Sequence, residues 1–339
     1  MIINLKIKRK LFIGFCVFCV AICLLFLWEI YVPYSLGPKP TVVYNVQKGW
    51  GDKEIAIYLE KQGIIKNSWF FRLYVVISGQ HSNIKAGTYN LSSSMSVTQI
   101  VKKFVSGDVI KNKITIIEGW NLKDISEYLE IKKICSKKDF LNLTKKDYSL
   151  SFDFLKDKPK GLSLEGYIFP DTYEISLAEK PEEILKNILA NFDKKLTPNL
   201  KSEIAAQHKS IFEIITMASI LEKEVKMFGD KKIVSGILWK RIENSMPLQV
   251  DATINYITGK NDGGVSVKDT KIDSPYNTYK YGGLPLGPIC NPGIESILAA
   301  IYPENSPYWY YLSADHTNKT IFSKTLEEHN VAIAKYLKP

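Results

Sequence analysis

One segment, Ile211–Val225, constrains the fold more than any other part of this 339-residue chain. It reads IFEIITMASILEKEV and is apolar at almost every position until it ends in the triplet Glu222-Lys223-Glu224. A helix that is apolar nearly all the way round lies buried in a protein core. The segment therefore predicts a central helix against which the rest of a globular domain packs.

The helical phase separates the two glutamates at the end of this segment. At about 100° per residue, Glu224 falls on the same side as Met217 and Leu221. Glu222 falls on nearly the opposite side. A carboxylate on an apolar face is costly unless it is paired or neutral, and burial raises its pKa toward the range that suits a general acid at neutral pH. The alternative is that both glutamates lie on a last turn that emerges into solvent.

The N-terminus indicates a membrane anchor. Basic residues at 6, 8, 9 and 10 precede an uncharged apolar run, Leu11–Trp28, which is long enough to cross a bilayer. The basic flank is expected to stay in the cytoplasm, which places the rest of the chain outside the cytoplasmic (inner) membrane. We therefore predict a cytoplasmic tail at 1–10 and a retained single-pass anchor at 11–31. A cleaved signal peptide is the alternative, but no clear small-x-small site follows the run.

Composition narrows the range of partners. The net charge is +10, and the lysines are spread singly or in pairs without a nucleic-acid motif, so an anionic polymer or a membrane is expected rather than DNA or RNA. Four histidines without a His/Cys cluster argue against a metal site, and no cofactor is expected. Cys135 and Cys290 lie outside the predicted membrane segment, and their spacing leaves open whether they pair.

A motif occurs twice. Val46–Ile65 reads VQKGWGDKEIAIYLEKQGII, and Ile116–Cys135 reads IIEGWNLKDISEYLEIKKIC. Each copy predicts a short strand, a Gly-Trp turn and an amphipathic helix. This pattern resembles the LysM-like module, which recognises glycans that contain N-acetylglucosamine. Trp50 and Trp120 either stack on a sugar or pack each helix onto its strand. We predict a LysM-like module at 40–112 and a catalytic domain at 113–339, which begins with the second repeat at 113–135.

The fold class predicted is α+β. Ser96–Gly107 is predicted as a helix that Ser96 caps and Gly107 closes. Tyr308–Ala314 and Thr320–Lys324 are predicted to form a hairpin. Three segments rich in glycine, proline or polar residues are predicted as rigid loops, on which binding groups are often placed: Met246–Ile257, Ser274–Tyr281 and Gly282–Gly293.

Five blocks, in this order, together resemble the YceG-like family of endolytic murein transglycosylases. They are EGYIFPDTY (Glu165–Tyr173), MASILEKE (Met217–Glu224), LQVDATINY (Leu248–Tyr256), SPYNTY (Ser274–Tyr279) and GLPLGPICNPG (Gly283–Gly293). The resemblance implies cleavage of the β-1,4 bond between N-acetylmuramic acid and N-acetylglucosamine in nascent peptidoglycan strands. It also implies that Glu224, the second glutamate of the triplet, is catalytic, and that penicillin-binding synthases are partners.

A lytic transglycosylase needs only one carboxyl group, because the muramyl 6-hydroxyl of the substrate attacks its own C1 and leaves a 1,6-anhydro end. Glu224 is expected to act first as acid and then as base. Polar side chains near it are predicted to contact the sugars, and three carboxylates are predicted to support the site. The predicted contacts are Gln249, Asp251, Tyr276, Asn277, Tyr279, Asn291 and Ser219, and the supporting residues are Glu222, Asp171 and Glu165.

Several alternatives stay open from the sequence. Asp251 could cap a helix at Ala252, and Asn277 could stabilise its turn. A muramidase-type hydrolase would need a second carboxylate, for which Asp251 and Glu165 are candidates. A membrane-anchored glycan-binding scaffold without catalytic activity is the more distant rival.

Overall fold

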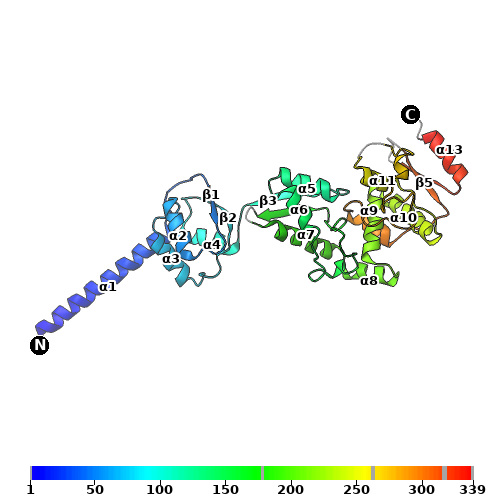
Figure 1. Cartoon of the computed structure of the whole chain (residues 1–339). Coiled ribbons are helices and arrows are strands. Elements are labelled where there is room, and N and C mark those ends of the chain that lie inside the picture. Colours follow the sequence, from blue (N-terminus) through cyan, green and yellow to red (C-terminus); the bar gives the residue numbers. More distant parts are fainter. Residues whose placement is uncertain (1, 177–178, 261–263, 315–318, 337–339) are drawn as a thin grey trace. The chain divides into compact units, whose positions relative to one another are not determined.

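The computed structural model describes residues 2–176, 179–260, 264–314 and 319–336. These residues form α-helices and three two-stranded sheets, a mixed α and β architecture (Figure 1). The chain divides into two compact units. Unit 1 comprises Met1–Lys113 and Glu174–Glu179, and unit 2 comprises Ile114–Tyr173 and Lys180–Pro339.

The first helix, α1 (Ile2–Tyr31), has the length and composition of a membrane span. Its stretch Arg9–Tyr31 has a mean hydropathy of 2.9, and the side chains of its most apolar part are not buried inside the protein. The end of the helix differs, because Ile30 is fully buried in the core of unit 1. The apolar stretch is therefore joined to unit 1 by packing as well as by the chain.

Unit 1 packs three helices on a two-stranded sheet. After α1, its elements are β1 (Val42–Val46), α2 (Asp52–Lys61), α3 (Ser68–Ile77), β2 (Gly87–Leu91) and α4 (Val97–Ser106). Antiparallel β1 and β2 pair from Val42 opposite Leu91 to Val46 opposite Gly87. Aromatic rings of Tyr44, Tyr89 and Phe104 meet at 4.8 to 6.0 Å between centroids in the core.

The predicted caps of α4 are confirmed. The Ser96 hydroxyl accepts a hydrogen bond from the Gln99 N–H at 3.3 Å, and the Gln99 side chain accepts one from the Ser96 N–H in return. Gly107 closes the helix in the left-handed region, with φ 74°.

Both copies of the repeated motif contain the predicted Gly-Trp turn and helix. The turn glycines, Gly49 and Gly119, have φ of 94° and 78°, and α5 (Leu122–Ile131) is the helix of the second copy. Each tryptophan is half-buried against a tyrosine two helix turns on, at 5.5 Å for Trp50–Tyr58 and 5.2 Å for Trp120–Tyr128. This matched packing supports the structural alternative for both tryptophans, and a LysM-like role stays a prediction.

Unit 2 is mainly helical, and the chain passes from one unit to the other within strand β3 and again within strand β4. Besides α5, the elements from residue 111 onward are β3 (Lys111–Thr115), α6 (Lys137–Leu143), η1 (Asp153–Leu155), β4 (Thr172–Ser176), α7 (Pro181–Lys195), α8 (Pro198–Ala206), α9 (Ile211–Glu224), α10 (Phe228–Glu243), α11 (Asp251–Thr258), η2 (Asp269–Lys271), α12 (Ile294–Ile301), β5 (Tyr310–Ala314), β6 (Lys319–Ser323) and α13 (Leu326–Tyr336). Strands β3 and β4 pair with each other, and β5 and β6 form the predicted hairpin, from Tyr310 opposite Ser323 to Ala314 opposite Lys319. The hairpin residues 315–318 lie outside the described residues.

Helix α9 is the centre of unit 2, as its apolar sequence predicts. All eight residues of Ile214–Leu221 are buried, and α8, α10, α11 and α12 contact the helix (Figure 1). Two of the loop motifs also meet here. Gly166 has φ 90°, and a Cβ on it would lie 2.6 Å from Pro288 and 2.8 Å from Ile215 of α9. Only glycine therefore lets these loops approach the helix so closely.

The prediction that Met246–Ile257 is a loop throughout is wrong, because α11 begins at Asp251. The local signals for this helix are present in the sequence: an acidic first residue, and Gly259 in the left-handed region after its last turn. The proposed cap at Asp251 is also corrected, since Val250 is the N-cap residue and Asp251 is already helical.

Candidate active site

Glu224 is the last residue of α9. Ser210 begins the helix with a capping box in which its hydroxyl accepts from the Glu213 N–H and its N–H donates to the Glu213 carboxylate. The backbone becomes extended at Val225, with φ −141°. The buried helix therefore presents one carboxyl group at the point where the chain leaves the core.

Both carboxylate oxygens of Glu224 have a donor. The Tyr311 hydroxyl of β5 donates to Oε2 at 3.1 Å, and the Ala252 N–H in the first turn of α11 donates to Oε1 at 3.3 Å. The Ser313 hydroxyl, also of β5, donates to the Glu224 carbonyl at 2.7 Å. The side chain is half-buried, so the alternative of a freely solvated helix end is wrong for Glu224.

Opposing effects set the acidity of this carboxyl. Burial raises the pKa of Glu224 from 4.5 to about 7, whereas the bonds from Ala252 and Tyr311 lower it and the charge of Asp251 raises it. A carboxyl with a pKa near 7 is populated as acid and as carboxylate at neutral pH. It can therefore give and take a proton in one reaction cycle.

Asp251 and Tyr279 lie beside this carboxyl. The Tyr279 hydroxyl donates to Asp251 Oδ1 at 2.5 Å, and Asp251 is exposed while Tyr279 is half-buried. Burial, then this bond and the charge of Asp251, raise the pKa of Tyr279, and Glu224 contributes in the same direction. The pair brings two of the predicted contact residues next to the predicted catalytic one.

Arg241 of α10 fastens the strand that carries Tyr311. Its Nε and Nη2 donate to the Trp309 carbonyl at 3.0 and 2.7 Å, and its Nη1 donates to the Leu248 carbonyl at 2.8 Å. Its guanidinium carbon lies 5.2 Å from the Tyr310 ring centroid. The side chain is buried, so these bonds replace lost solvation. One cation thus ties the start of β5 to the loop before α11.

The sequence does not reveal Tyr311 or Arg241 as site residues. Tyr311 is one of three tyrosines in the segment YWYYLSA, and it is 87 positions from Glu224 in the chain. Strand alternation gives the residues on one face but not which face meets α9. The abundance of aromatic residues near the hairpin is the signal that was present.

Glu222 binds the N-terminal end of a different helix, α12. Its Oε2 accepts from the Gly293 N–H at 3.0 Å and from the Ser296 hydroxyl at 2.6 Å, both at the start of α12. Lys231 pairs with the same oxygen at 3.4 Å, and both side chains are nearly buried. The two glutamates therefore lie at the N-terminal ends of two different helices, α11 for Glu224 and α12 for Glu222, as their separation by helical phase allows.

Glu165 and Asn291 form a buried polar network. Glu165 accepts from the Leu122 N–H at 3.0 Å and from Asn291 Nδ2 at 3.0 Å, and the Tyr256 hydroxyl lies 3.5 Å away. Burial raises the pKa of Glu165 to about 8. Asn291 is fully buried and also accepts from the Ile168 N–H at 2.8 Å. Asn291 therefore joins two loop motifs, and its role as a sugar contact is not favoured by its burial.

Ser219 and Asn277 are likewise occupied by backbone groups. The Ser219 hydroxyl donates to the Thr216 carbonyl and accepts from the Ile289 N–H at 3.0 Å. Asn277 donates to two carbonyls of the preceding segment, including that of Ile272 at 2.7 Å. These bonds support the alternative in which Asn277 stabilises its turn.

The other predicted residues differ in their exposure to solvent. Gln249 is exposed and has φ 51°, an unusual left-handed conformation for a residue other than glycine, immediately after the loop held by Arg241. Tyr276 is half-buried, with its ring 5.0 Å from that of Tyr256. Asp171 accepts from the Thr172 N–H and from Asn191, as a turn-supporting residue would.

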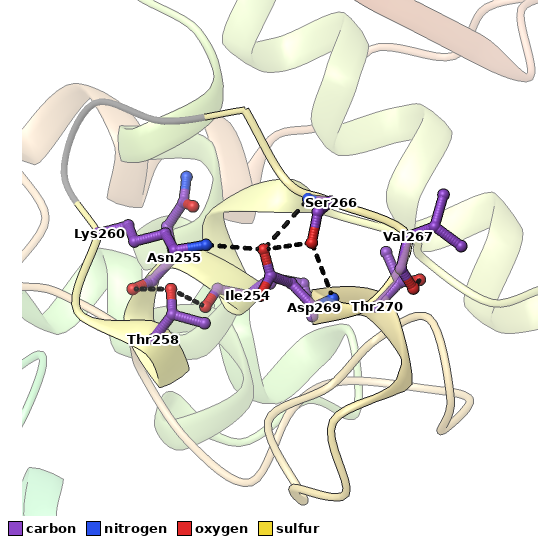
Figure 2. Close-up of polar contacts among 8 residues, drawn as sticks. All are labelled: Ile254, Asn255, Thr258, Lys260, Ser266, Val267, Asp269 and Thr270. Carbon is purple, nitrogen blue, oxygen red and sulfur yellow. Dashed lines mark hydrogen bonds and ion pairs between the residues drawn. The ribbon is translucent and has the colours of Figure 1, made fainter.

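A polar cluster fixes the far end of α11 (Figure 2). Lys260 donates to Asp269 Oδ2 at 2.8 Å, and the Ser266 hydroxyl donates to the same oxygen at 2.8 Å. The bonds to Lys260 and Ser266 lower the pKa of Asp269 to about 2. This cluster ties the segment after α11 to η2, so that both ends of the helix that donates to Glu224 are held.

The two cysteines outside α1 are unpaired. Cys135 is half-buried, and Cys290 is buried with its Sγ 3.3 Å from the Ser219 carbonyl. Among the described residues, His, Cys, Asp and Glu side chains do not gather in a group of three that could hold a metal ion.

Comparisons with known proteins show which proteins this chain is similar to. The model of the YceG-like family matches residues 44–335. A Bacillus subtilis (strain 168) protein named endolytic murein transglycosylase is 35% identical over 320 residues, which cover 90% of this chain and 87% of that protein. A Streptococcus pneumoniae serotype 2 protein of the same name is 30% identical and is matched over 60% of its length by 90% of this chain. A solved structure of a putative YceG-like protein from Listeria monocytogenes is 34% identical, with a TM-score of 0.60, and is covered completely by 87% of this chain.

Proposed function

The chain belongs to the YceG-like family, and we propose that it is an endolytic murein transglycosylase that cuts peptidoglycan strands, the activity named for its relatives. The single observation that carries the proposed mechanism is the environment of the Glu224 carboxyl. It ends a buried helix, both of its oxygens accept hydrogen bonds, and its pKa is about 7. These properties suit a group that transfers a proton in both directions.

The reaction uses one carboxyl and the substrate's own hydroxyl. Glu224 protonates the glycosidic oxygen between N-acetylmuramic acid C1 and N-acetylglucosamine O4, and the C1–O4 bond breaks with its electron pair remaining on O4. The muramyl 6-hydroxyl oxygen then bonds to C1, and its proton passes to the Glu224 carboxylate. The acid is restored, a 1,6-anhydro end forms and no water is consumed.

The surroundings of Glu224 support both steps. Burial stabilises the neutral acid before bond cleavage, and the donors Tyr311 and Ala252 stabilise the carboxylate after it. We assign sugar contact to Gln249, Asp251 and Tyr279, because these side chains are exposed or half-buried beside the carboxyl or its loops.

A muramidase-type hydrolase is the second candidate. One observation favours it: Asp251 is an exposed carboxylate close enough for its charge to raise the pKa of Glu224. Retaining and inverting hydrolases both use such a second carboxyl. Glu165 is less suited to this role, since it is buried and bonded to Leu122 and Asn291.

Digestion of purified sacculi by the full-length protein and two variants tests these assignments. Glu224→Gln is expected to lower the rate of bond cleavage by about 10²–10⁴-fold while the protein still binds sacculi. Asp251→Asn is expected to weaken substrate binding but to leave 1,6-anhydro products. Full activity in Glu224→Gln would refute the mechanism. Sacculi that the unaltered protein binds but does not cleave would favour the scaffold. Loss of all cleavage in Asp251→Asn, with reducing ends from the unaltered protein, would favour the hydrolase.

The proposal extends to location. Helix α1 anchors the protein in the cytoplasmic membrane with residues 1–10 in the cytoplasm, supported by its apolar stretch and the basic residues before it. The catalytic domain then acts outside the membrane, where residues 40–112 form the LysM-like module. Penicillin-binding synthases as partners rest on the family resemblance alone.

A further inference from the structure

Helix α3 of unit 1 presents apolar side chains to solvent. Trp69, Val76 and Ile77 are 58%, 60% and 67% exposed, although the opposite side of the helix carries the fully buried Phe71 and Val75. Trp69 and Val76 are two helix turns apart and therefore lie on one face. A soluble protein usually presents polar groups at such positions, so this face is suited to an apolar environment.

This face adjoins the helix that is proposed to span the membrane. Phe70, next to Trp69, has its ring 6.2 Å from that of Phe26 in α1. Lys66, just before α3, lies 5.0 Å from the Trp28 ring. Phe26 and Trp28 both belong to the apolar stretch Arg9–Tyr31. Phe26 is five residues from the end of that stretch, about 7.5 Å along the helix axis, so α3 meets α1 at the depth where lipid headgroups and acyl chains join.

The surroundings of the exposed face suit a lipid surface. Trp69, Arg72 and Val76 line a hollow of about 450 Å³, and the start of α2 contributes Asp52, Lys53 and Glu54 to its lining. Tryptophan is enriched where hydrocarbon meets headgroups, and arginine can lay its stem on apolar surface with its charge among phosphates. An apolar helix face bordered by charged residues is typical of helices that lie in the membrane interface.

We propose that the outward face of α3, formed by Trp69, Arg72, Leu73, Val76 and Ile77, docks on the outer surface of the bilayer that α1 spans. The inference rests on the proposed membrane anchorage and adds a second membrane contact to it. Because α3 lies directly against α1, the surface of a bilayer around α1 lies next to this helix. This second contact, together with α1, holds unit 1 against the membrane surface.

Quenching of tryptophan emission by brominated lipids tests the contact. The full-length protein is reconstituted in vesicles of phosphatidylethanolamine and phosphatidylglycerol, with or without bromine in the upper acyl chain. The contribution of each tryptophan is the difference between the unaltered protein and a variant: Trp69→Phe for the docking face, Trp28→Phe for the anchor, and Trp239→Phe as a control. Trp239 is buried in unit 2, where its indole N–H donates to the Ala300 carbonyl.

The expected result is that bromine removes most of the emission of Trp69 and Trp28 and leaves that of Trp239 unchanged. Quenching of Trp28 without quenching of Trp69 would overturn the docking proposal and retain the anchor, as would be seen if a protein or a second copy of the chain covered α3. An absence of quenching for both tryptophans would overturn the anchorage together with the docking.

Discussion

Removal of one hydroxyl group, in Tyr311→Phe, is expected to move the alkaline limit of activity to higher pH. The Tyr311 hydroxyl donates to Glu224 Oε2 at 3.1 Å and lowers the pKa of that carboxyl. A hydrogen bond to a charged group contributes about 1.5–3 kcal/mol, and one pKa unit corresponds to about 1.36 kcal/mol. Loss of the bond therefore raises the pKa of Glu224 by about 1–2 units, from its present value of about 7.

The pH dependence of the cleavage rate at low substrate concentration measures this shift. Glu224 must be protonated to act as the acid, so the alkaline limb of the profile reports its pKa in the free enzyme. Tyr311→Phe is expected to move that limb upward by about 1–2 pH units and to lower the plateau, because a weaker acid transfers its proton less readily. Release of soluble muropeptides from sacculi is the assay.

Tyr310→Phe is the matched control, because it removes the same group one residue away on β5. The Tyr310 ring packs on Arg241 and on the His329 ring, at 5.3 Å from the latter. Its alkaline limb is expected to stay in place. A profile for Tyr311→Phe that keeps the original limb, or moves it to lower pH, would refute the assignment of Tyr311 as the donor that tunes Glu224.

Three further changes have defined outcomes. Burial raises the pKa of Glu165 from 4.5 to about 8, so the folded state holds this proton more tightly and the free energy of unfolding falls as pH rises through that interval. Glu165→Gln is expected to reduce this slope in denaturant titrations, and an unchanged slope would count against a buried acid. Glu222→Ala leaves Lys231 buried without its carboxylate and is expected to destabilise the protein by about 3–5 kcal/mol; a thermal midpoint equal to that of the unaltered protein would contradict the pairing. Gln249→Gly removes the strain of a non-glycine residue in the left-handed region and is expected to stabilise the fold by about 1 kcal/mol. The same change removes the side chain that is proposed to contact sugar, so KM is expected to rise. An unchanged KM would show that Gln249 does not contact the sugar.

The features of both units that the sequence predicts correctly depend on residues that are close together in the chain. The burial of α9 follows from its apolar sequence, and the ends of α4 follow from Ser96 and Gly107. The separation of Glu222 from Glu224 follows from helical phase. Each of these depends on residues within a few turns, for which side-chain chemistry and helical geometry are sufficient.

The remaining parts of the site depend on contacts between distant segments. Tyr311 reaches Glu224 because Arg241 binds the Trp309 carbonyl before β5 and the Leu248 carbonyl before α11. Every residue has a backbone carbonyl, so the sequence does not indicate which carbonyls Arg241 binds. The sequence predicts that Asn291 and Ser219 contact sugar, but both side chains are buried, which only the packed structure reveals. Their hydrogen bonds are made within the protein, to the Ile168 N–H and the Glu165 carboxylate for Asn291 and to the Ile289 N–H for Ser219.

Helix α11 is not predicted from the sequence for a different reason. Its sequence, DATINYIT, contains the signals of a short helix, but the dense loops on both sides favoured a loop prediction. Eight residues are too few to form a stable helix alone. The helix is stabilised by its contacts with α9, where Ala252 meets Glu224, and by the cluster of Lys260, Ser266 and Asp269 beyond it.

Digestion of sacculi in heavy-oxygen water tests most directly whether Glu224 catalyses a reaction that consumes no water. Mass spectrometry of the products of the full-length protein is expected to show 1,6-anhydro ends, lighter by one water than hydrolysis products and free of heavy oxygen. Glu224→Gln is expected to produce almost none of them. Reducing ends that each carry one heavy oxygen atom and that depend on Glu224 would contradict the mechanism and identify a hydrolase.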